Sequence, residues 1–550
     1  MELVIHIELR NTSGAMEVMN QTFELPDAQS DPINEGEEAI LDAFTAAQML
    51  AYQRYLASVA REAAEVAQAA YGGTVVENTT PYRVDGEIGR ITFPTYAVQQ
   101  SKQILWNSVP KVFGAQGPRE FYATRSAKKL LLDFASLSSY RTTARIFNRV
   151  RRSSRQNRTP VTTIASFVHR EGIAVQAYLG HFVTSTLAQH QFTSDGVPQS
   201  ESNPVYQRPL AEAKHAAGRL SRDRVSQARL EYNADKAPDR QIPVSAVDAV
   251  YEDLHGAVNI SFDDVGVKKQ KAQRSILDSE EAEASPPTEV GVPSGAARAA
   301  SILGPEDPTL KRVHNTIAHI ETPEGHYILN GLGTVTVLQV VSAFLLHKDL
   351  LREHAVKFFV DGARSLHADI LAGMRWFRPM RIFLDWFHLH EKCKVELSLV
   401  LRGKDVRNPV LAELMPLLWL GQIDAAIAYL RAIRPAQIKS GKSVDRLIEY
   451  FERNREHIPC YALRAQLGLR NSSNRGEKAN DLCVAARQKD NGMSWSRDGS
   501  VALASTTTLQ RNDELDEWCR SRSLSFNWVL THFLSLRFYG FGYMQLLIGC

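Results

Sequence analysis

The sequence predicts an α/β fold that is divided among several domains. From residue 257 onward, short apolar runs typical of buried strands alternate with longer segments of helical periodicity. The chain has 550 residues, which is too long for one hydrophobic core, so two to four domains are expected. Its 44% apolar and 23% charged residues are typical of a globular protein and exclude a disordered chain.

The first half of the chain is predicted to be mainly helical. Residues 1–115 begin with a weak strand-like alternation, and an Ala-rich pattern over 36–71 then indicates a long helix. Residues 116–200 are basic and have helical periodicity. Residues 201–256 contain several prolines and many charges, which is typical of a linker with one charged helix.

The second half carries the predicted sheet. Three strand-like segments come first, and two more alternate with helices, so the strands that carry Asp263 and Asp361 can lie side by side. The predicted divisions are a core segment 257–387 with a disordered excursion at 270–309, a helical insertion 388–468, a second core segment 469–505 and an atypical tail 506–550.

Three acidic residues occur where a carboxylate is costly unless it is paired or holds a metal. Asp263 lies in an apolar run, Asp361 ends another run, and Glu477 lies at the start of a helical pattern. Hard oxygen ligands from two strands and one helix suit a two-metal site for phosphoryl transfer. The competing interpretations are that Asp361 caps the next helix and that Glu477, opposite its helix's apolar stripe, is a solvated surface residue.

Three segments carry a family resemblance. They are Asp263-Asp264-Val265-Gly266-Val267-Lys268, Val360-Asp361-Gly362-Ala363-Arg364, and Ser473-Asn474-Arg475-Gly476-Glu477, followed by Arg487 and Lys489. In this order, and with a helical insertion between the last two, they resemble DDE-type bacterial insertion-sequence transposases of the group related to Mutator-like enzymes. The second segment matches the family's Asp-Gly-Ala-Lys/Arg pattern, and the third matches its Ser-Asn-x-x-Glu pattern. The resemblance covers about residues 257–505.

The resemblance implies a ribonuclease H-like mixed sheet with an all-helical insertion. It further implies that Asp263, Asp361 and Glu477 bind two Mg²⁺ ions, for which Mn²⁺ can substitute. Such an enzyme cuts DNA at the transposon ends and joins the exposed 3′-hydroxyl to target DNA. Because both ends are handled together, a homo-oligomer is expected.

Two further acidic residues are alternates for the site. Asp264 adjoins Asp263, but strand alternation places the two on opposite faces, and the family spacing to Val267-Lys268 favours Asp263. Asp385 ends a strand and is either an additional site group or the N-cap of the next helix. His388, His390 and Cys393 lack a suitably spaced fourth ligand, so a structural role is favoured over zinc binding.

Arginines at helical spacing precede a second helical pattern and suggest a helix-turn-helix. Thr159 is expected to cap the second helix, with Pro160 at its first position and Gly172 at its end. The alternative is an ordinary solvated basic face. A further cation cluster follows Glu477, with Trp495 as either a base-stacking residue or a core residue. The predicted DNA contacts are Arg141, Arg145, Arg149, Arg152, Thr162, Thr163, Ser166, Arg170, Arg487 and Lys489, with Arg151 beside them.

Composition also constrains the cellular compartment in which the protein is expected. Five scattered cysteines without a CxxC pair argue against a zinc ribbon or a disulfide framework, and the N-terminus lacks the features of a secretory signal. The tail at 526–550 is apolar, but His532 and Arg537 near its centre disfavour a membrane span. A bacterial, cytoplasmic, nucleoid-associated protein is expected. Two alternatives remain open, namely a nuclease that does not join strands and an inactive DNA-binding remnant of a transposase.

Overall fold

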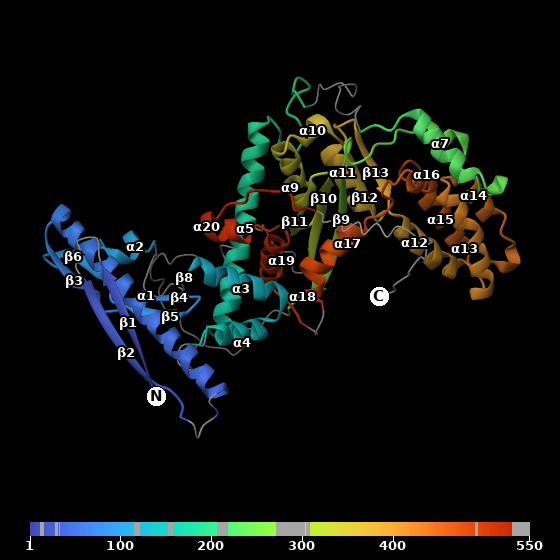
Figure 1. Ribbon diagram of the computed structural model, residues 1–550. Coiled ribbons are helices and arrows are strands. Elements are labelled where there is room, and N and C mark those ends of the chain that lie inside the picture. The colour runs from blue at the N-terminus through green and yellow to red at the C-terminus, as the bar shows by residue number, and fades with distance from the viewer. Residues whose placement is uncertain are drawn as a thin grey trace, which may run out of the picture.

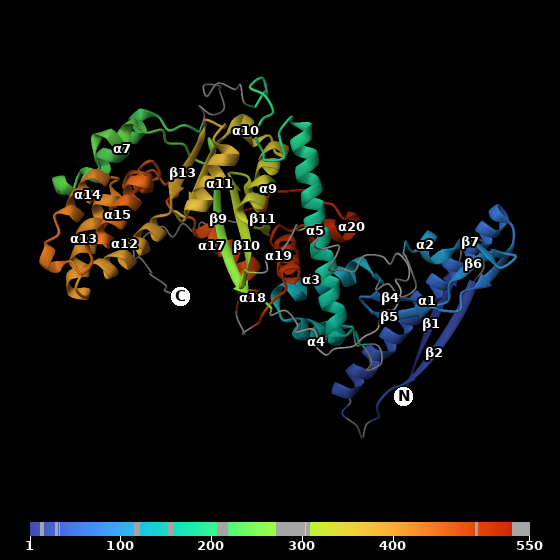
Figure 2. The same cartoon turned by 180° about the vertical axis from the view of Figure 1, so that it is seen from behind.

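The computed structural model describes residues 1–10, 16–27, 31, 33–114, 122–151, 158–205, 218–270, 303, 309–489 and 493–530. The fold is mixed α/β, as the sequence predicts, with helices and several sheets. Figures 1 and 2 show the N-terminal strands at one end of the molecule, the largest sheet in the middle and a block of helices at the opposite end. The predicted excursion at 270–309 falls almost wholly outside the described residues.

The N-terminal region contains more strand than the predicted, mainly helical region. A hairpin and two three-stranded sheets surround the long helix α1 (Asn34–Tyr71). Short alternating segments of four or five residues form most of these strands, and they give too weak a periodic signal to be recognised. The strands are β1 (Glu2–Arg10), β2 (Met16–Glu24), β3 (Thr74–Glu77), β4 (Tyr82–Gly86), β5 (Gly89–Phe93), β6 (Tyr96–Gln100), β7 (Gln103–Asn107) and β8 (Tyr122–Ala123), with a short helix α2 (Ser108–Val112) after β7.

Three helices follow, and the third is much longer than expected. Gly172 does not end a helix, because α5 continues to Gln189. A Cβ at Gly172 would lie 2.1 Å from the carbonyl oxygen of Ala502, so this glycine permits the close crossing of α5 and α19 (Arg497–Arg511). Pro160, not Thr159, occupies the N-cap position of α5. The helices are α3 (Arg125–Leu137), α4 (Tyr140–Val150) and α5 (Val161–Gln189), and the charged linker then holds α7 (Arg222–Asn233) and the 3₁₀ turns η2 (Pro238–Arg240) and η3 (Val244–Asp248).

The largest sheet has five strands in the order β11-β10-β9-β12-β13. The first three pair antiparallel, whereas β9, β12 and β13 run parallel to one another. Its strands are β9 (Ala257–Lys268), β10 (Arg312–Thr322), β11 (Gly325–Leu332), β12 (Ala355–Val360) and β13 (Met380–Leu384), and the helices between them are α9 (Thr334–His347), α10 (Leu350–Glu353) and α11 (Arg364–Met374). The strands that carry Asp263 and Asp361 are therefore neighbours, as the sequence predicts.

A block of helices follows β13 and has a hydrophobic core of its own. Its helices are α12 (Trp386–Val400), α13 (Lys404–Trp419), α14 (Ile423–Arg431), α15 (Gly441–Arg453) and α16 (Tyr461–Gln466), with the 3₁₀ turns η4 (Pro435–Gln437) and η5 (Arg455–His457). The chain then returns to the sheet through α17 (Asn474–Asn480), a π-helical turn η6 (Asp481–Ala485) and α18 (Ala486–Gln488). This return is what places residues near Glu477 beside strands formed two hundred positions earlier.

Opposite faces of the sheet are covered by different helices. Asn315 of β10 and Asn330 of β11 donate hydrogen bonds to Ser500 and Ser505, at 2.8 and 3.1 Å, and so face α19 (Arg497–Arg511). α17 lies on this same face, against β9 and β10 (Figure 1). The other face packs against α9, since a Cβ at Gly331 would lie 3.1 Å from Val337.

The described residues after α18, as far as residue 530, contribute to the core. α19 continues to Arg511, α20 (Leu515–Ser521) follows it, and Phe526 is only 2% exposed. Val529 pairs with His326 at the start of β11. The segment from residue 506, predicted as an atypical tail, is thus packed against the rest of the fold as far as residue 530. Within the described residues, no helix is both long and apolar enough to cross a membrane.

Candidate functional site

Asp361 and Asp385 directly follow the parallel strands β12 and β13, and Asp263 lies within β9, two residues beyond its last pair with β12. Ser261 of β9 is level with Phe359 of β12, and Val360 of β12 is level with Leu384 of β13. If these registers continue by one or two residues, Asp263, Asp361 and Asp385 come to the same level on three adjacent strands. Neighbouring strands are about 4.8 Å apart. The sequence prediction that Asp263 and Asp361 belong together is thus supported by strand order and register.

Glu477 approaches these strands because α17 packs unusually close to β9. A Cβ at Gly476 would lie 3.0–3.1 Å from the side chain and backbone of Ser261, so a glycine here lets the helix rest on the strand. One turn further along, the Asn480 amide donates a 2.9 Å hydrogen bond to Asp263 Oδ2. The helix-borne and strand-borne carboxylates are therefore held on one face of the sheet.

Asp263 and Asp264 point to opposite faces, as alternation requires. Asp263 faces α17, where its other carboxylate oxygen accepts a 2.9 Å bond from the Asp264 backbone N–H. Asp264 instead accepts a hydrogen bond from Thr316 and pairs with His314, at 3.0 and 2.9 Å. Only Asp263 of the two shares a face with Glu477.

Asp385 is fully buried and links the strand ends to α17. It is the N-cap of α12, as one of its two predicted roles requires, because it accepts a 2.7 Å bond from the His388 N–H. It also accepts bonds from His388 Nδ1 at 3.0 Å and from both the backbone N–H and the hydroxyl of Ser473. The Ser473 hydroxyl lies 3.2 Å from Glu477 Oε1, so Asp385 positions the start of α17.

His388 lies among the carboxylates and is the site residue that sequence reasoning missed. Its Nδ1 is 3.0 Å from Asp385 and 3.6 Å from Glu477. The hydrogen bond to Asp385, together with the charges of Asp385, Glu477 and Asp361, raises its pKa to about 9. The imidazole is therefore a cation at neutral pH. The spacing Asp385-x-x-His388 at a strand-to-helix junction was the available signal, because an N-cap and the residue three positions later face each other.

The carboxylates titrate differently because their surroundings differ. Burial raises the pKa of Asp263, although Asn480, the Asp264 N–H and the charge of His388 oppose this. Burial also raises the pKa of Glu477, and His388 again opposes it. For Asp385, burial would raise the pKa, but hydrogen bonds from His388 and Ser473 outweigh it and lower the pKa. With all four carboxylates ionised, the single imidazolium leaves a local net charge of −3.

A group of possible metal-ligand atoms lies here. The carboxylates of Asp385 and Glu477 and the ring of His388 offer such atoms within 4.8 Å of one another, and Asn480 of α17 ties Asp263 to the same helix. Only a neutral imidazole has a free lone pair for a metal, so the carboxylates are the available ligands while His388 is protonated. Asp361 is exposed and accepts a 2.9 Å bond from the Ala363 N–H. By contrast, Cys393 is buried in the core of the helical block, so the His388, His390 and Cys393 combination does not form a zinc site.

The predicted DNA contacts lie in different environments. Arg141, Arg145 and Arg149 are exposed along α4, whereas Arg152 lies outside the described residues. Arg151 is buried, with an ion pair of 2.7 Å to Asp85 of β4. Arg151 therefore joins the N-terminal strands to α4 and is not part of the exposed basic face.

The remaining predicted DNA contacts lie at the start of α5 and in the segment after α17. Thr162, Thr163, Ser166 and Arg170 line a small hollow of about 280 Å³ with Phe167. Arg487 is buried, donates a 2.9 Å bond to the Ala135 carbonyl and lies over the ring of Trp495, itself a core residue. In this position Arg487 cannot contact a DNA strand. Lys489 is exposed.

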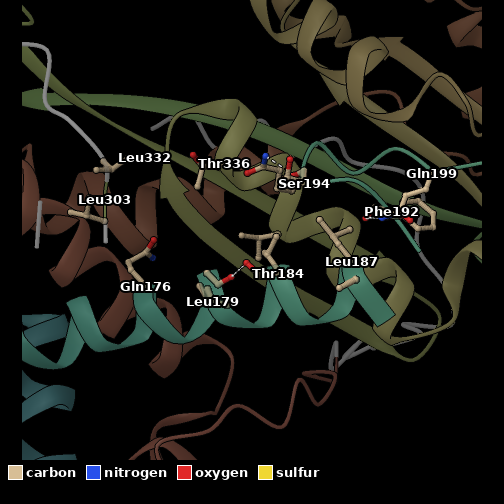
Figure 3. A pocket seen from close by; sticks show the side chains of 15 residues that line it. Gln176, Leu179, Thr184, Leu187, Phe192, Ser194, Gln199, Leu303, Leu332 and Thr336 are labelled. Atoms are coloured by element: carbon tan, nitrogen blue, oxygen red, sulfur yellow. Dashed lines mark hydrogen bonds between the residues drawn. The ribbon is translucent and has the colours of Figure 1, made fainter. Parts of the chain in front are cut away.

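A separate cavity of about 510 Å³ lies between α5 and α9, next to β11. Figure 3 shows Gln176, Leu179, Thr184 and Leu187 of α5 on one wall and Thr336 across from them. None of the described residues that line it is ionisable. The cavity borders α9, whereas Glu477 and Asp263 lie on the opposite face, so it has no part in the carboxylate site.

Comparisons with protein-family models, with curated proteins and with solved structures found no match to this chain.

Proposed function

We propose that this protein is a DDE-type transposase with a ribonuclease H-like core. One observation carries the proposal: α17, which holds Glu477, packs on β9, which holds Asp263 and pairs with β12, the strand directly before Asp361. The sheet order, three antiparallel strands followed by two parallel ones, is compatible with this fold. In this proposal the protein cleaves DNA at transposon ends and joins the resulting 3′-hydroxyl to target DNA.

In the proposed enzyme, Asp263, Asp361 and Glu477 would hold Mg²⁺, or Mn²⁺ in its place. Divalent cations bound there would supply Lewis-acid stabilisation of the attacking and leaving oxygens of a phosphodiester. The protein's own contribution is positioning. Asp385 fixes Ser473 and thus the start of α17, and His388 attracts Glu477 toward the strand ends. Both effects keep the helix-borne carboxylate at a defined place, as phosphoryl transfer requires.

For DNA contact we propose the exposed arginines of α4 and the polar start of α5. Arg141, Arg145 and Arg149 would meet phosphates, and Thr162 and Ser166 are exposed at the first turns of α5. Lys489 follows the proposed site. Arg487 is left out because it is buried. Because two transposon ends are processed together, we also propose that the active form is a homo-oligomer.

The test is a cleavage and strand-transfer assay with defined-end DNA and Mg²⁺ or Mn²⁺. Duplexes from the DNA flanking its reading frame serve as donors, uncut to measure cleavage and pre-cut to measure joining. Asp263→Asn should reduce products by at least about 100-fold, since it removes a charged ligand of the proposed site. Asp264→Asn is the matched control, because its side chain faces away from Glu477, and it should retain activity within about threefold.

Three results would count against the proposal. Equal losses from Asp263→Asn and Asp264→Asn would exclude this site as the source of activity. Cleavage without any joined product would identify a nuclease that does not transfer strands. DNA binding without cleavage under any metal condition would identify an inactive remnant. Circular dichroism of each variant shows whether a loss of activity reflects unfolding.

A further inference from the structure

The hairpin at the N-terminus has an edge that, among the described residues, pairs with no other strand. Among the described residues, β1 pairs with β2 alone, in a sheet of only two strands. The face of β1 that is directed toward α1 carries Leu3, Ile5, Ile7 and Leu9, and all four remain only partly buried. An isolated two-stranded sheet is marginally stable, and an unpaired edge is a template for another strand.

The hydrogen-bond pattern shows which residues occupy that edge. The Leu25 N–H donates a 2.8 Å bond to the Met1 carbonyl, so odd-numbered residues of β1 form the hydrogen-bonded pairs with β2. Even-numbered residues, from Glu2 to Arg10, therefore direct their backbone N–H and C=O groups to the free edge. Their side chains are on the exposed face of the hairpin.

The sequence of β1 is self-complementary in one antiparallel register. Pairing two copies about His6 pairs all nine residues, and on the exposed face it places Glu2 opposite Arg10 and Val4 opposite Glu8. On the face toward α1 it places Leu3 opposite Leu9 and Ile5 opposite Ile7, so every contact there is apolar. A shift of the two-fold axis to Ile5 would instead oppose Glu2 and Glu8, which have like charges.

The outer edge of β2 is less suitable. Antiparallel pairing of two β2 strands about Asn20 would place Glu17 opposite Phe23 and Met19 opposite Gln21 on the face toward α1. These are mismatched pairs of a charged or polar side chain with an apolar one. The edge of β1 is thus the better template for a second copy of the same strand.

We propose that two copies of this protein associate through β1, forming a continuous four-stranded sheet in the order β2-β1-β1-β2. A two-fold axis through the paired His6 residues relates the copies, which closes the assembly at a dimer. The α1 helices of both copies then lie on the same face of this sheet. α1 exposes Ile40, Leu41 and Phe44, which adds apolar surface to the associating unit. The proposal does not depend on the chemistry of the carboxylate site.

Disulfide cross-linking of the full-length chain tests the register. In the proposed dimer the two His6 Cα atoms are about 5.5 Å apart, within disulfide range, so His6→Cys should form a covalent dimer on mild oxidation. Asn20→Cys is the matched control, because Asn20 is directly opposite His6 in the hairpin but one strand further from the axis. Its two copies would be about 14 Å apart and should not cross-link. The unmodified chain, oxidised in the same way, shows how much cross-linking its natural cysteines produce.

A charge exchange tests the same pairing by light scattering. Glu2→Arg should weaken dimerisation about threefold to tenfold, since it sets two arginines opposite each other, and Arg10→Glu added to it should restore the dimer. A monomer at all concentrations would overturn the proposal. So would cross-linking of Asn20→Cys in place of His6→Cys, which would assign the edge of β2. Circular dichroism confirms that each variant is folded.

Discussion

At the scale of single residues, the positive charge of His388 offsets the repulsion among the neighbouring carboxylates. His388 is the cation nearest to both Asp385 and Glu477, and its charge also acts on Asp263 and Asp361. Its pKa is about 9 in the folded protein and about 6.5 in an unfolded chain. The stabilisation from protonated His388 is therefore fully present below pH 6.5 and is lost as the pH rises through 9.

His388→Asn should remove this pH dependence while keeping an N–H donor for Asp385. We expect a loss on the order of 1 kcal/mol at pH 6, since the 39% exposure of His388 screens its charge, and little loss at pH 10. Urea unfolding from pH 6 to 10 measures both. His390→Asn is the control, because His390 lies outside the cluster of Asp385, His388 and Glu477. If the free energy of unfolding changed with pH to the same extent in both variants, this role of His388 would be contradicted.

The sequence indicates some of the residues near the carboxylates and not others. Asp263, Asp361 and Glu477 were identifiable because a carboxylate in or after an apolar run, or at a matching motif, is unusual in itself. For His388 the spacing to Asp385 was the one available signal, and it is weak, since a histidine on a helix is ordinary and only the fold brings it to the other carboxylates. Arg151 misled for a related reason, because an arginine at helical spacing looks the same whether it meets solvent or Asp85.

At the scale of elements, the crossing of α5 and α19 requires a residue without a side chain. Gly172→Ala should destabilise the protein by about 3 kcal/mol, since the added Cβ would collide with backbone atoms of Ala502, which cannot move aside cheaply. Gly180→Ala in the same helix is the control, because no atom lies within 4 Å of its added Cβ. That change should be neutral or stabilise by up to about 1 kcal/mol. Thermal unfolding of both variants shows whether close packing or helix propensity determines the effect of the added Cβ. An increase in stability in both variants would contradict the close crossing.

Helices and strands could be predicted from the sequence where their apolar periodicity is strong. The prediction failed where one residue type can have two structural roles. The five strands of the largest sheet and the helical block follow apolar patterns that are long enough to recognise. Gly172 was expected to end its helix, because glycine serves both as a helix stop and as a point of close approach. Which use applies depends on Ala502, more than three hundred positions away.

At the scale of the whole molecule, the described residues from 506 to 530 complete the core. Phe526 packs against Phe182 of α5 and Phe344 of α9, with ring centroids 4.5 and 5.8 Å away, and against Tyr327 of β11. It thus joins three elements that are widely separated in sequence. An apolar C-terminal segment could equally have been a tail, and only these long-range contacts distinguish the two.

Phe526→Ala should therefore destabilise the whole fold by about 3–5 kcal/mol, because a large buried ring leaves a cavity that α5, α9 and β11 line together. Leu530→Ala is the matched control, since Leu530 is 68% exposed, and it should change stability by less than about 0.5 kcal/mol. Denaturant unfolding followed by tryptophan fluorescence, which reports on the nearby Trp528, measures both variants. A small effect at Phe526 would mean that the C-terminal segment detaches readily and that the core is complete without it. A large effect would indicate that the sheet, α5 and the segment around Phe526 unfold as one cooperative unit, so that the strands next to Asp263 and Asp361 depend on contacts on the opposite face of the sheet.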